Sequence, residues 1–345
     1  MEQPNIRIKD IAQKAGVSKG TIDRVLHNRG EVNAKTKEKV LAILKESGYQ
    51  PNLIARALTS KKESIIAVLI PQQNKENPYW QKPLKGMISA SEEIKPFNFN
   101  IEYCLFDQYD ENQFKEKIKQ IIELQPQAVV IAPVFKQATS LLTENLNKSE
   151  IPYIFINSDI PTENRLRFIG QDSYSGGYMA AKLLFYGLKA KGTILIINNS
   201  KNTDQFVDRK NGFLSFYKEN VQKDKYTIIK KDIISNFENN INEIFEEHKD
   251  IVGIYVLGSK SYLAAEYIEK INRKDIILIG YDVIDQNLKY LESGYIDFII
   301  SQRSQEQGHL SIIELFNYIA KRKTETSDIL MPIDIITKEN YKFYR

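Results

Sequence analysis

The sequence predicts a small all-α domain with a helix-turn-helix, followed by a two-lobed α/β domain built on parallel sheets. Near the start, two amphipathic patterns meet at a glycine, and from Ser64 onwards strand-like apolar runs alternate with amphipathic segments. Residues 1–62 hold 13 Lys and Arg against 6 Asp and Glu, a net charge of +7, whereas the other 283 of the 345 residues carry −3. A basic head on a mildly acidic body is typical of a polyanion-binding module joined to a separate domain.

The helix-turn-helix is predicted from the spacing of residues around Gly16. Apolar and small residues follow a helical spacing before this glycine and again after it, at Ile8, Ile11, Ala12, Ala15, Thr21, Ile22, Val25 and Leu26. Gly16 tolerates the positive φ of a tight turn, and Ser18 stands where an N-cap accepts a hydrogen bond from the second helix. The second helix of such a motif enters the major groove of DNA.

Two further helices are predicted in the N-terminal region. The first runs from about Ala34 to Ser47, is capped by Asn33 and ends at Gly48. We expect its inner face to carry Val40, Leu41 and Leu44. The second, over residues 53–58 after the cap Asn52, is too short to be stable alone in water, so we expect it to become ordered on binding.

From Ser64 the sequence alternates between strands and helices. The near-continuous apolar runs, typical of parallel strands buried on both faces, are Ser64–Pro71, Ile101–Phe106, Ala128–Ala132, Tyr153–Ile156, Thr193–Asn198, Ile251–Leu257 and Ile276–Gly280, with Ile296–Ser301 and Ile333–Thr337 as two further candidates. The amphipathic segments between them are Lys85–Ile94, Asn112–Leu124, Ser175–Leu188, Val207–Glu219, Tyr262–Lys270 and Gln305–Ala320. These are too many strands for one compact sheet, which favours two lobes with a cleft between them.

The expected domain boundaries follow from these patterns. We expect a DNA-binding domain over residues 1–50, a hinge helix and linker over 51–63, and a two-lobed domain over 64–345. The first lobe is expected to comprise residues 64–163 and 300–326, and the second lobe residues 164–299 and 327–345.

Composition excludes several classes of protein. The hydrophobic content of 42% is sufficient for buried cores. The single cysteine, Cys104, excludes an internal disulfide and a thiolate metal cluster. We find no apolar leader and no apolar run of membrane-spanning length, so we expect a cytoplasmic protein that does not contact membranes. We expect no cofactor and no metal.

Polar and aromatic side chains follow several of the predicted strands, at the sheet edge where parallel sheets bind ligands. They are Asn77, Tyr79, Trp80, Asn157, Arg209, Asp282 and Gln302. Arg and carboxylate groups fix hydroxyls through paired hydrogen bonds, and an aromatic ring covers the C–H face of a sugar. We therefore expect a polyhydroxyl ligand at these residues, although adjacent aromatic residues such as Tyr79 and Trp80 commonly belong to a core instead.

With these motifs in hand, the chain resembles the lactose-repressor (LacI/GalR) family of bacterial transcription regulators over essentially its whole length. The most specific match is Ile-Lys-Asp-Ile-Ala-x-x-Ala-Gly-Val-Ser-x-x-Thr-Ile-x-Arg-Val-Leu at residues 8–26, followed by Gly48-Tyr-x-Pro-Asn52 and Ala55-x-x-Leu58. The remainder resembles the core of that family, which is similar to periplasmic sugar-binding proteins such as ribose-binding protein.

The resemblance implies which residues meet DNA. The helix from Ser18 to His27 would read the major groove, with Lys19, Gly20 and Arg24 facing bases and Thr21 binding phosphate. Residues 52–58 match the hinge helix, including Asn52, Ala55 and Leu58. In a dimer, the paired Leu58 side chains would wedge into the minor groove and kink the site. The implied partner is a near-palindromic operator bound by a homodimer.

The resemblance also implies an effector site and shows where this chain departs from the family pattern. Asn77, Tyr79 and Trp80 match the aromatic sugar contact, and Arg209, Asp282 and Gln302 match effector-contacting positions. Asn157 stands where an acidic sugar ligand is usual, and Gly258 stands where an Asn is usual. The pocket is therefore expected either to be wider near Gly258 or to be filled there by Tyr262. In the DNA-reading helix, Gly20 replaces a longer side chain and Asp23 a small polar one.

Several functions remain open at this point. The leading hypothesis is a sequence-specific regulator, expected to be a repressor and not an enzyme, whose small sugar or sugar-derivative effector closes the two lobes. The same architecture could respond to a purine or another non-sugar metabolite. A sugar-processing enzyme fused to a helix-turn-helix is a remote alternative, because Gly187-x-x-x-x-Gly192-Thr193 lacks the lysine of a phosphate-binding loop. An exported solute-binding protein is opposed by the basic head.

Overall fold

The computed structural model describes residues 8–27, 30, 32–47, 63–74, 78–160, 164–199, 204–221, 225–321 and 327–344. These residues belong to two domains, residues 1–60 and residues 61–345. Several predicted positions lie outside the described residues: Gly48, the hinge-helix residues Asn52, Ala55 and Leu58, and Asn77. None of the described helices is long and apolar enough to cross a membrane.

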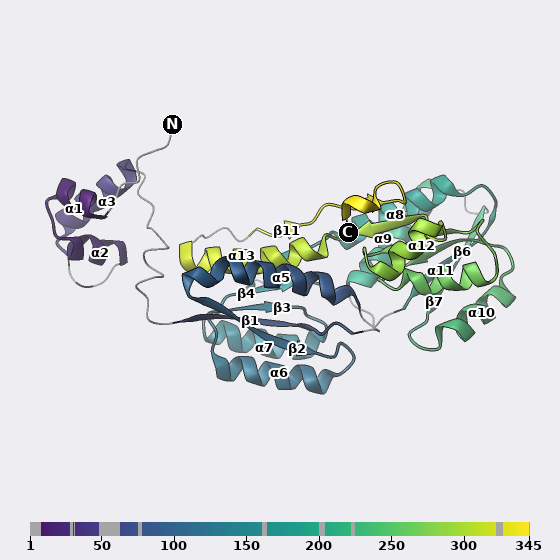
Figure 1. Ribbon diagram of the computed structural model, residues 1–345, viewed down its shortest axis with the longest axis horizontal. Coiled ribbons are helices and arrows are strands. Elements are labelled where there is room, and N and C mark those ends of the chain that lie inside the picture. Colours follow the sequence, from purple (N-terminus) through teal and green to yellow (C-terminus); the bar gives the residue numbers. More distant parts are fainter. Residues whose placement is uncertain are drawn as a thin grey trace. The chain divides into compact units, whose positions relative to one another are not determined.

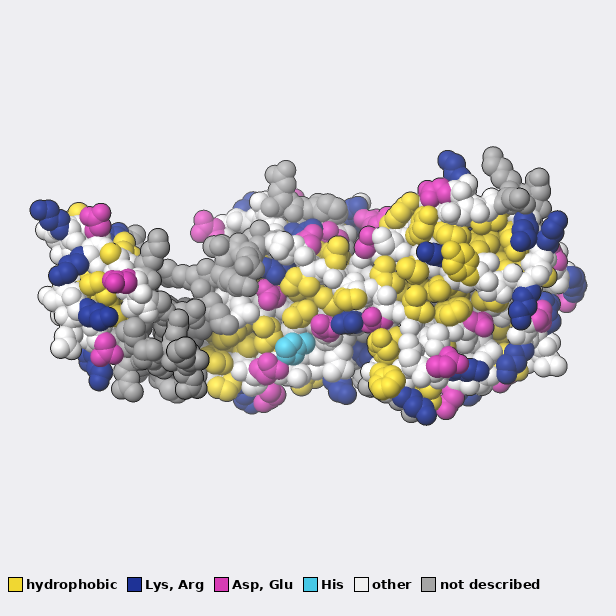
Figure 2. Space-filling model, turned by 90° about the horizontal axis from the view of Figure 1, so that it is seen from above, with side chains coloured by type: hydrophobic (Ala, Val, Ile, Leu, Met, Phe, Trp, Pro, Cys, Tyr) yellow, Lys and Arg dark blue, Asp and Glu magenta, His cyan; other side chains and the backbone are white. Residues whose placement is uncertain are grey.

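The described part of the N-terminal domain consists of α1 (Ile8–Ala15), α2 (Lys19–His27) and α3 (Ala34–Glu46) (Figure 1). Its buried core is formed by residues of all three helices: Ile11, Ala12, Ala15, Ile22, Val25 and Val40. These are apolar positions that the sequence spacing predicts, because each helix buries one stripe of its surface. Lys and Arg side chains lie over the face of this domain that Figure 2 shows.

The turn between α1 and α2 has the predicted geometry. Gly16 has a φ of +68°, and the backbone N–H of Val17 donates to the carbonyl oxygen of Ala12 at 3.0 Å. Ser18 caps α2, because its Oγ accepts a hydrogen bond from the backbone N–H of Thr21 at 3.1 Å. The predicted inward orientation of Leu41 is wrong, since this side chain is 47% exposed.

The second domain is built on two sheets that each have six strands among the described residues. In chain order, the first half of this domain contains β1 (Ser64–Pro71), η1 (Pro78–Trp80), α5 (Gln81–Ile94), η2 (Lys95–Phe97), β2 (Phe99–Phe106), α6 (Glu111–Leu124), β3 (Ala128–Ile131), α7 (Lys136–Lys148), β4 (Tyr153–Ile156) and β5 (Arg167–Gly170). The next part contains α8 (Ser173–Gly187), β6 (Gly192–Asn198), α9 (Asp204–Asn220), β7 (Tyr226–Asp232), α10 (Phe237–Glu247), β8 (Ile251–Val256), α11 (Ser261–Lys270), β9 (Ile277–Tyr281), α12 (Asp285–Ser293) and β10 (Phe298–Ser301). The last part contains α13 (Ser304–Lys321), β11 (Ile329–Leu330), β12 (Asp334–Ile336) and η3 (Tyr341–Tyr344).

The strand order is β11-β5-β4-β3-β1-β2 in the first sheet and β12-β10-β9-β8-β6-β7 in the second. Neighbouring strands are parallel throughout, except that β12 runs antiparallel to β10. In the first lobe, α5 and α13 cover one face of the sheet and α6 and α7 cover the other (Figure 1). In the second lobe, α8 and α9 pack on one face and α10, α11 and α12 on the other. The predicted two-lobed α/β architecture with parallel sheets is therefore confirmed.

The lobe boundaries differ from those expected. Strands β5 and β11 belong to the first sheet, so the first lobe extends to Gly170 and includes Leu330, beyond the boundaries expected near residues 163 and 326. Strand β10 belongs to the second sheet, although residue 300 was expected to begin the return to the first lobe. The physical reason is that β5 and β11 are too short to form a recognisable apolar run in the sequence. Their place in the first sheet depends on backbone pairing with neighbouring strands.

The chain passes between the lobes after β5, after β10 and after β11. The buried amide of Gln171 joins these three passages, because its Nε2 donates to the carbonyl oxygens of Ser301 at 3.0 Å and Pro332 at 2.9 Å. One side chain thus holds the crossing segments together at the base of the cleft.

Glycines allow two helix pairs to pack backbone against backbone. A Cβ atom on Gly212 of α9 would lie 1.9 Å from the carbonyl oxygen of Tyr174 in α8, and one on Gly177 of α8 would lie 1.9 Å from that of Arg209. In the first lobe, a Cβ atom on Gly86 would lie 1.9 Å from the carbonyl oxygen of Gln305. Any side chain at these positions would push the helices apart.

We predict that Gly212→Ala lowers the free energy of unfolding by at least about 1–3 kcal/mol, because the added methyl group meets backbone that cannot move aside. Asn211→Ala, an exposed change on the same helix, should stay within about 0.5 kcal/mol of the unsubstituted protein. Urea denaturation followed by circular dichroism measures both values. Equal stability of the two variants would contradict the proposed contact.

Candidate functional site

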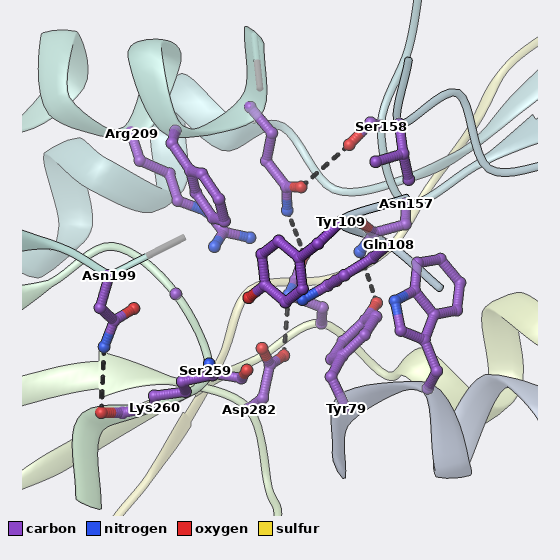
Figure 3. Close-up of a pocket in the computed structure, with 16 residues that line it drawn as sticks. Tyr79, Gln108, Tyr109, Asn157, Ser158, Asn199, Arg209, Ser259, Lys260 and Asp282 are labelled. Carbon is purple, nitrogen blue, oxygen red and sulfur yellow. Dashed lines mark hydrogen bonds between the residues drawn. The ribbon is translucent and has the colours of Figure 1, made fainter. Parts of the chain in front are cut away.

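A pocket lies between the two lobes at the carboxyl ends of strands from both sheets (Figure 3). The first lobe contributes Tyr79, Trp80, Gln108, Tyr109, Val134, Asn157 and Ser158. The second lobe and the crossing segment after β10 contribute Asn199, Gln205, Phe206, Arg209, Gly258, Ser259, Lys260, Asp282 and Gln302. This is the edge at which parallel α/β sheets hold their ligands.

The predicted effector residues that the structure describes all line this one pocket: Tyr79, Trp80, Asn157, Arg209, Asp282 and Gln302. Asn77 lies outside the described residues. Sequence positions more than 220 residues apart therefore converge, because each follows a strand or opens a helix at the same edge. That they bind a ligand stays a prediction.

Asn157 and Asp282 occupy equivalent places in the two lobes. Asn157 directly follows β4, and its N–H donates to the carbonyl oxygen of Ile169 at 3.1 Å; Asp282 directly follows β9, and its N–H donates to that of Ile300 at 3.0 Å. Both have left-handed backbones, with φ values of +67° and +74°. Asn and Asp tolerate this region better than most residues, and the conformation places both side chains at the pocket.

A chain of side-chain hydrogen bonds crosses the floor of the pocket from one lobe to the other. Ser158 Oγ donates to Gln205 Oε1 at 3.1 Å, and Gln205 Nε2 donates to Gln302 Oε1 at 2.9 Å. Gln302 Nε2 then donates to Asp282 Oδ1 at 2.7 Å. Because every link has one donor and one acceptor, the orientation of each amide is fixed by its neighbours.

Arg209 is a nearly fully buried guanidinium on the wall formed by α9. Its Nη1 donates to the carbonyl oxygen of Leu257 at 2.6 Å, and its guanidinium carbon lies 3.5 Å from the centroid of the Tyr281 ring. The Nε and Nη2 atoms have no hydrogen-bond partner within the described part of the chain. A buried guanidinium with donors unused is costly, and a ligand oxygen would satisfy them.

Tyr79 and Trp80 serve both the core and the pocket. Their rings are 5.1 Å apart and nearly perpendicular, and both belong to the apolar cluster of the first lobe while lining the pocket. The Tyr79 hydroxyl accepts a hydrogen bond from Asn157 Nδ2. The two interpretations that the sequence left open, core and ligand contact, are therefore compatible at these residues.

Burial dominates the electrostatics of the pocket. Desolvation raises the pKa of Asp282 from 3.8 to about 6, although the Arg209 charge and the hydrogen bond from Gln302 both act to lower it. Burial likewise raises the pKa of the Tyr79 hydroxyl well above 10, and it lowers the pKa of Lys82. The lining of the pocket thus combines two cationic residues, Arg209 and Lys260, with one carboxyl group, Asp282, whose pKa burial raises.

The space beside Gly258 is not filled by Tyr262, which packs against the core of the second lobe. Asn199 and Phe206 lie there instead. Two pocket residues were not predicted from the sequence: Asn199, which follows β6 at the same edge as the other strand-end residues, and Gln205, which lies one helical turn before Arg209. Tyr109 lies shortly after the end of β2, so its position after a strand could have predicted it as a pocket residue.

The predicted DNA-reading residues lie on α2 of the N-terminal domain. Lys19, Gly20 and Arg24 are exposed, as base-facing residues must be. Thr21 is half-buried, and its hydroxyl is 3.0 Å from the Oγ of the cap residue Ser18. The first turn of this helix thus presents a cation and open backbone, a combination suited to a DNA groove.

We predict that Asp282→Asn stabilises the protein at pH 7.5 and has far less effect at pH 4.5. The pKa of Asp282 is higher in the folded chain than in the unfolded chain, so the free energy of unfolding falls as the pH rises from about 4 through 6. Above this range the ionised carboxylate lowers the free energy of unfolding by about 3 kcal/mol. Urea denaturation at both pH values measures the difference. Asn211→Ala, an exposed change in the same lobe that removes no ionisable group, should show no such pH dependence, and an equal effect of Asp282→Asn at both pH values would refute the assignment.

Comparisons with known proteins agree with this architecture. Residues 66–323 match the periplasmic binding protein domain family, and residues 7–52 match the bacterial regulatory proteins of the lacI family. The chain is 24% identical over 350 residues to a ribose operon repressor of Lactococcus lactis subsp. lactis, covering 97% of this chain and 98% of the relative. It is 30% identical over 178 residues to the HTH-type transcriptional regulator DegA of Bacillus subtilis, so this match spans 51% of either protein.

Among solved structures, the chain is similar to a protein from Bacteroides fragilis described as a LacI transcriptional regulator. The TM-score is 0.76 at 31% sequence identity, and the match covers 82% of this chain and 100% of that one. The second domain therefore has the periplasmic-binding-protein fold, and the chain belongs to the LacI family as a DNA-binding transcriptional regulator.

Proposed function

We propose that this regulator binds a small sugar or sugar derivative between its lobes and represses transcription in a manner that this effector controls. The observation that carries the proposal is the pocket itself. Donors of Arg209, the carboxyl group of Asp282 and the rings of Tyr79 and Trp80 surround one space, and these groups suit a ligand with many hydroxyls and an apolar face. The ribose operon repressor named among its relatives supports the same class of effector.

Two polar contacts join the lobes to each other. Lys136 Nζ of the first lobe lies 3.1 Å from Asp204 Oδ2 of the second, and Lys82 Nζ donates to the carbonyl oxygen of Tyr344 at 3.2 Å. A ligand that touches both walls stabilises the conformation in which such contacts form. We propose that this change alters how two copies of the chain present their N-terminal domains to the operator.

We further propose that the protein acts in the cytoplasm as a homodimer on a near-palindromic operator. A two-fold dimer places two recognition helices about one helical turn of DNA apart. Lys19 and Arg24 are the exposed cations on α2 through which each helix would contact base edges.

We predict that a neutral monosaccharide raises the melting temperature of the full chain. A ligand present at about 100 times its dissociation constant adds about 2.7 kcal/mol to stability when only the folded state binds it. A thermal-shift screen over monosaccharides, sugar phosphates and purines measures this. Arg209→Lys should abolish most of the shift, because it keeps the charge but loses the planar fork of donors.

Asn211→Ala, on the exposed side of the same helix, serves as the control and should leave the shift intact. A shift that persists in Arg209→Lys would remove this residue from the site. A response to purines alone would replace the sugar with a purine as the effector.

We predict that Arg24→Ala weakens operator binding by about 1–3 kcal/mol and changes the preferred sequence, as loss of a base contact does. Selection of binding sequences from random DNA by the full chain, followed by footprinting, measures both effects. Lys39→Ala removes an exposed cation from α3 and should weaken binding without changing the sequence preference. Unchanged preference in Arg24→Ala would contradict its role, and protection of a single half-site would contradict the dimer.

A further inference from the structure

Two buried side chains of the pocket are held by the same loop, which joins β8 to α11. Arg209 Nη1 donates to the carbonyl oxygen of Leu257, and Asn199 Nδ2 donates to that of Lys260 at 3.1 Å. Arg209 is 1% exposed and Asn199 is 2% exposed, and both line the pocket (Figure 3). Each side chain is thus fixed by one backbone bond, and its remaining polar atoms are available to a ligand.

The remaining polar atoms have opposite hydrogen-bonding character. Arg209 Nε and Nη2 can only donate, and Asn199 Oδ1 can only accept. None of these atoms has a hydrogen-bond partner within the described residues, although all are buried. The orientation of the Asn199 amide is determined by its bond to Lys260, because a carbonyl oxygen accepts only from the Nδ2 side. The oxygen must therefore point away from Lys260.

Gly258 creates the space in which the Asn199 oxygen lies. A Cβ atom at this position would lie 3.1 Å from Asn199 Oδ1 and 3.5 Å from Cζ of Phe206. The first distance is tighter than ordinary packing, so a side chain at residue 258 would displace the amide. The position of the Asn199 amide therefore depends on the absence of a side chain at Gly258.

We propose that Asn199, in the space left by Gly258, is a specificity-determining residue that accepts a hydrogen bond from a hydroxyl group of the ligand. A hydroxyl group that reaches Asn199 Oδ1 pairs with it by donating its hydrogen. A carboxylate group at that place offers acceptors only, so it leaves Asn199 Oδ1 unpaired. The residue therefore favours a hydroxyl over a carboxylate at this position of the ligand. The inference rests on the proposed sugar effector.

The test is isothermal titration of the full chain with D-ribose, D-glucose, D-galactose and D-fructose, with the monodeoxy derivatives of whichever sugar binds, and with its phosphate. Asn199→Ala should weaken binding of the parent sugar about tenfold, as loss of one buried hydrogen bond does. One monodeoxy derivative should bind the unsubstituted protein more weakly by a similar factor, yet bind Asn199→Ala as well as the parent does. Such non-additivity identifies the hydroxyl that the residue contacts.

A matched control is Asn198→Ala, one residue earlier, whose amide donates to Asp232 Oδ1 and does not line the pocket. Its affinity for the parent sugar should be unchanged. Gly258→Ala provides a second variant that keeps the Asn199 side chain. It should weaken binding severalfold in the unsubstituted background and have no effect in the Asn199→Ala background, because the displaced oxygen is then absent.

The outcomes separate this inference from the function on which it rests. If a sugar binds and depends on Arg209, but Asn199→Ala and Gly258→Ala leave its affinity unchanged, the inference fails and the proposed function stands. Equal affinity of the unsubstituted protein for the parent sugar and for every monodeoxy derivative would also overturn the inference. If none of these sugars binds, the proposed sugar effector fails and the inference fails with it.

Discussion

In each lobe, a pair of glycines brings two helix backbones into direct contact, and the positions of the pocket side chains depend on these contacts. Gly177 and Gly212 join α8 to α9, and the backbone atom that Gly177 meets is the carbonyl oxygen of Arg209 itself. Gly86 and Gly308 join α5 to α13 close to the first turns of both helices. Trp80 and Gln302, which line the pocket, lie just before α5 and α13, so the contact between these helices also constrains the pocket residues at their starts.

Several residues of the pocket adopt conformations or environments that cost free energy in the folded chain. Two of its residues, Asn157 and Asp282, have left-handed backbones, and Asp282 is a buried carboxyl group. Arg209 and Asn199 retain buried polar atoms without hydrogen-bond partners in the described structure. Such features cost free energy in the folded chain. The unpartnered polar atoms of Arg209 and Asn199 are the part of this cost that a ligand of the proposed kind would offset.

The sequence predicted the fold well wherever periodicity was strong. Gly16, Ser18 and the buried stripe of α1 and α2 follow from spacing alone, and so do the long strands of both sheets. It failed for β5 and β11, which are short, and for β7 (Tyr226–Asp232), which lies at a sheet edge and is only partly buried, so it has no continuous apolar run. Leu41 was misplaced because Val40, Ile43 and Leu44 already form the apolar stripe of α3, and Leu41 lies beside it.

The candidate site was predictable only in part. Strand-end position identified Asn157, Asp282 and Gln302, because parallel strands bring their carboxyl ends to one edge. The same reasoning could have reached Asn199. What it could not supply is the contact between Asn199 and Gly258, since these residues belong to different loops and their proximity depends on the backbone path of each.

Trp80 gives the protein an optical property of its own. It is the only tryptophan among the 345 residues, so the indole emission of the whole chain originates in one wall of the pocket. Its ring is 4% exposed and lies edge-on to Tyr79. A change in the surroundings of this ring alters the emission of a single fluorophore, with no background from other indoles. The native chain therefore carries an intrinsic fluorescent reporter of events in the pocket, without any label.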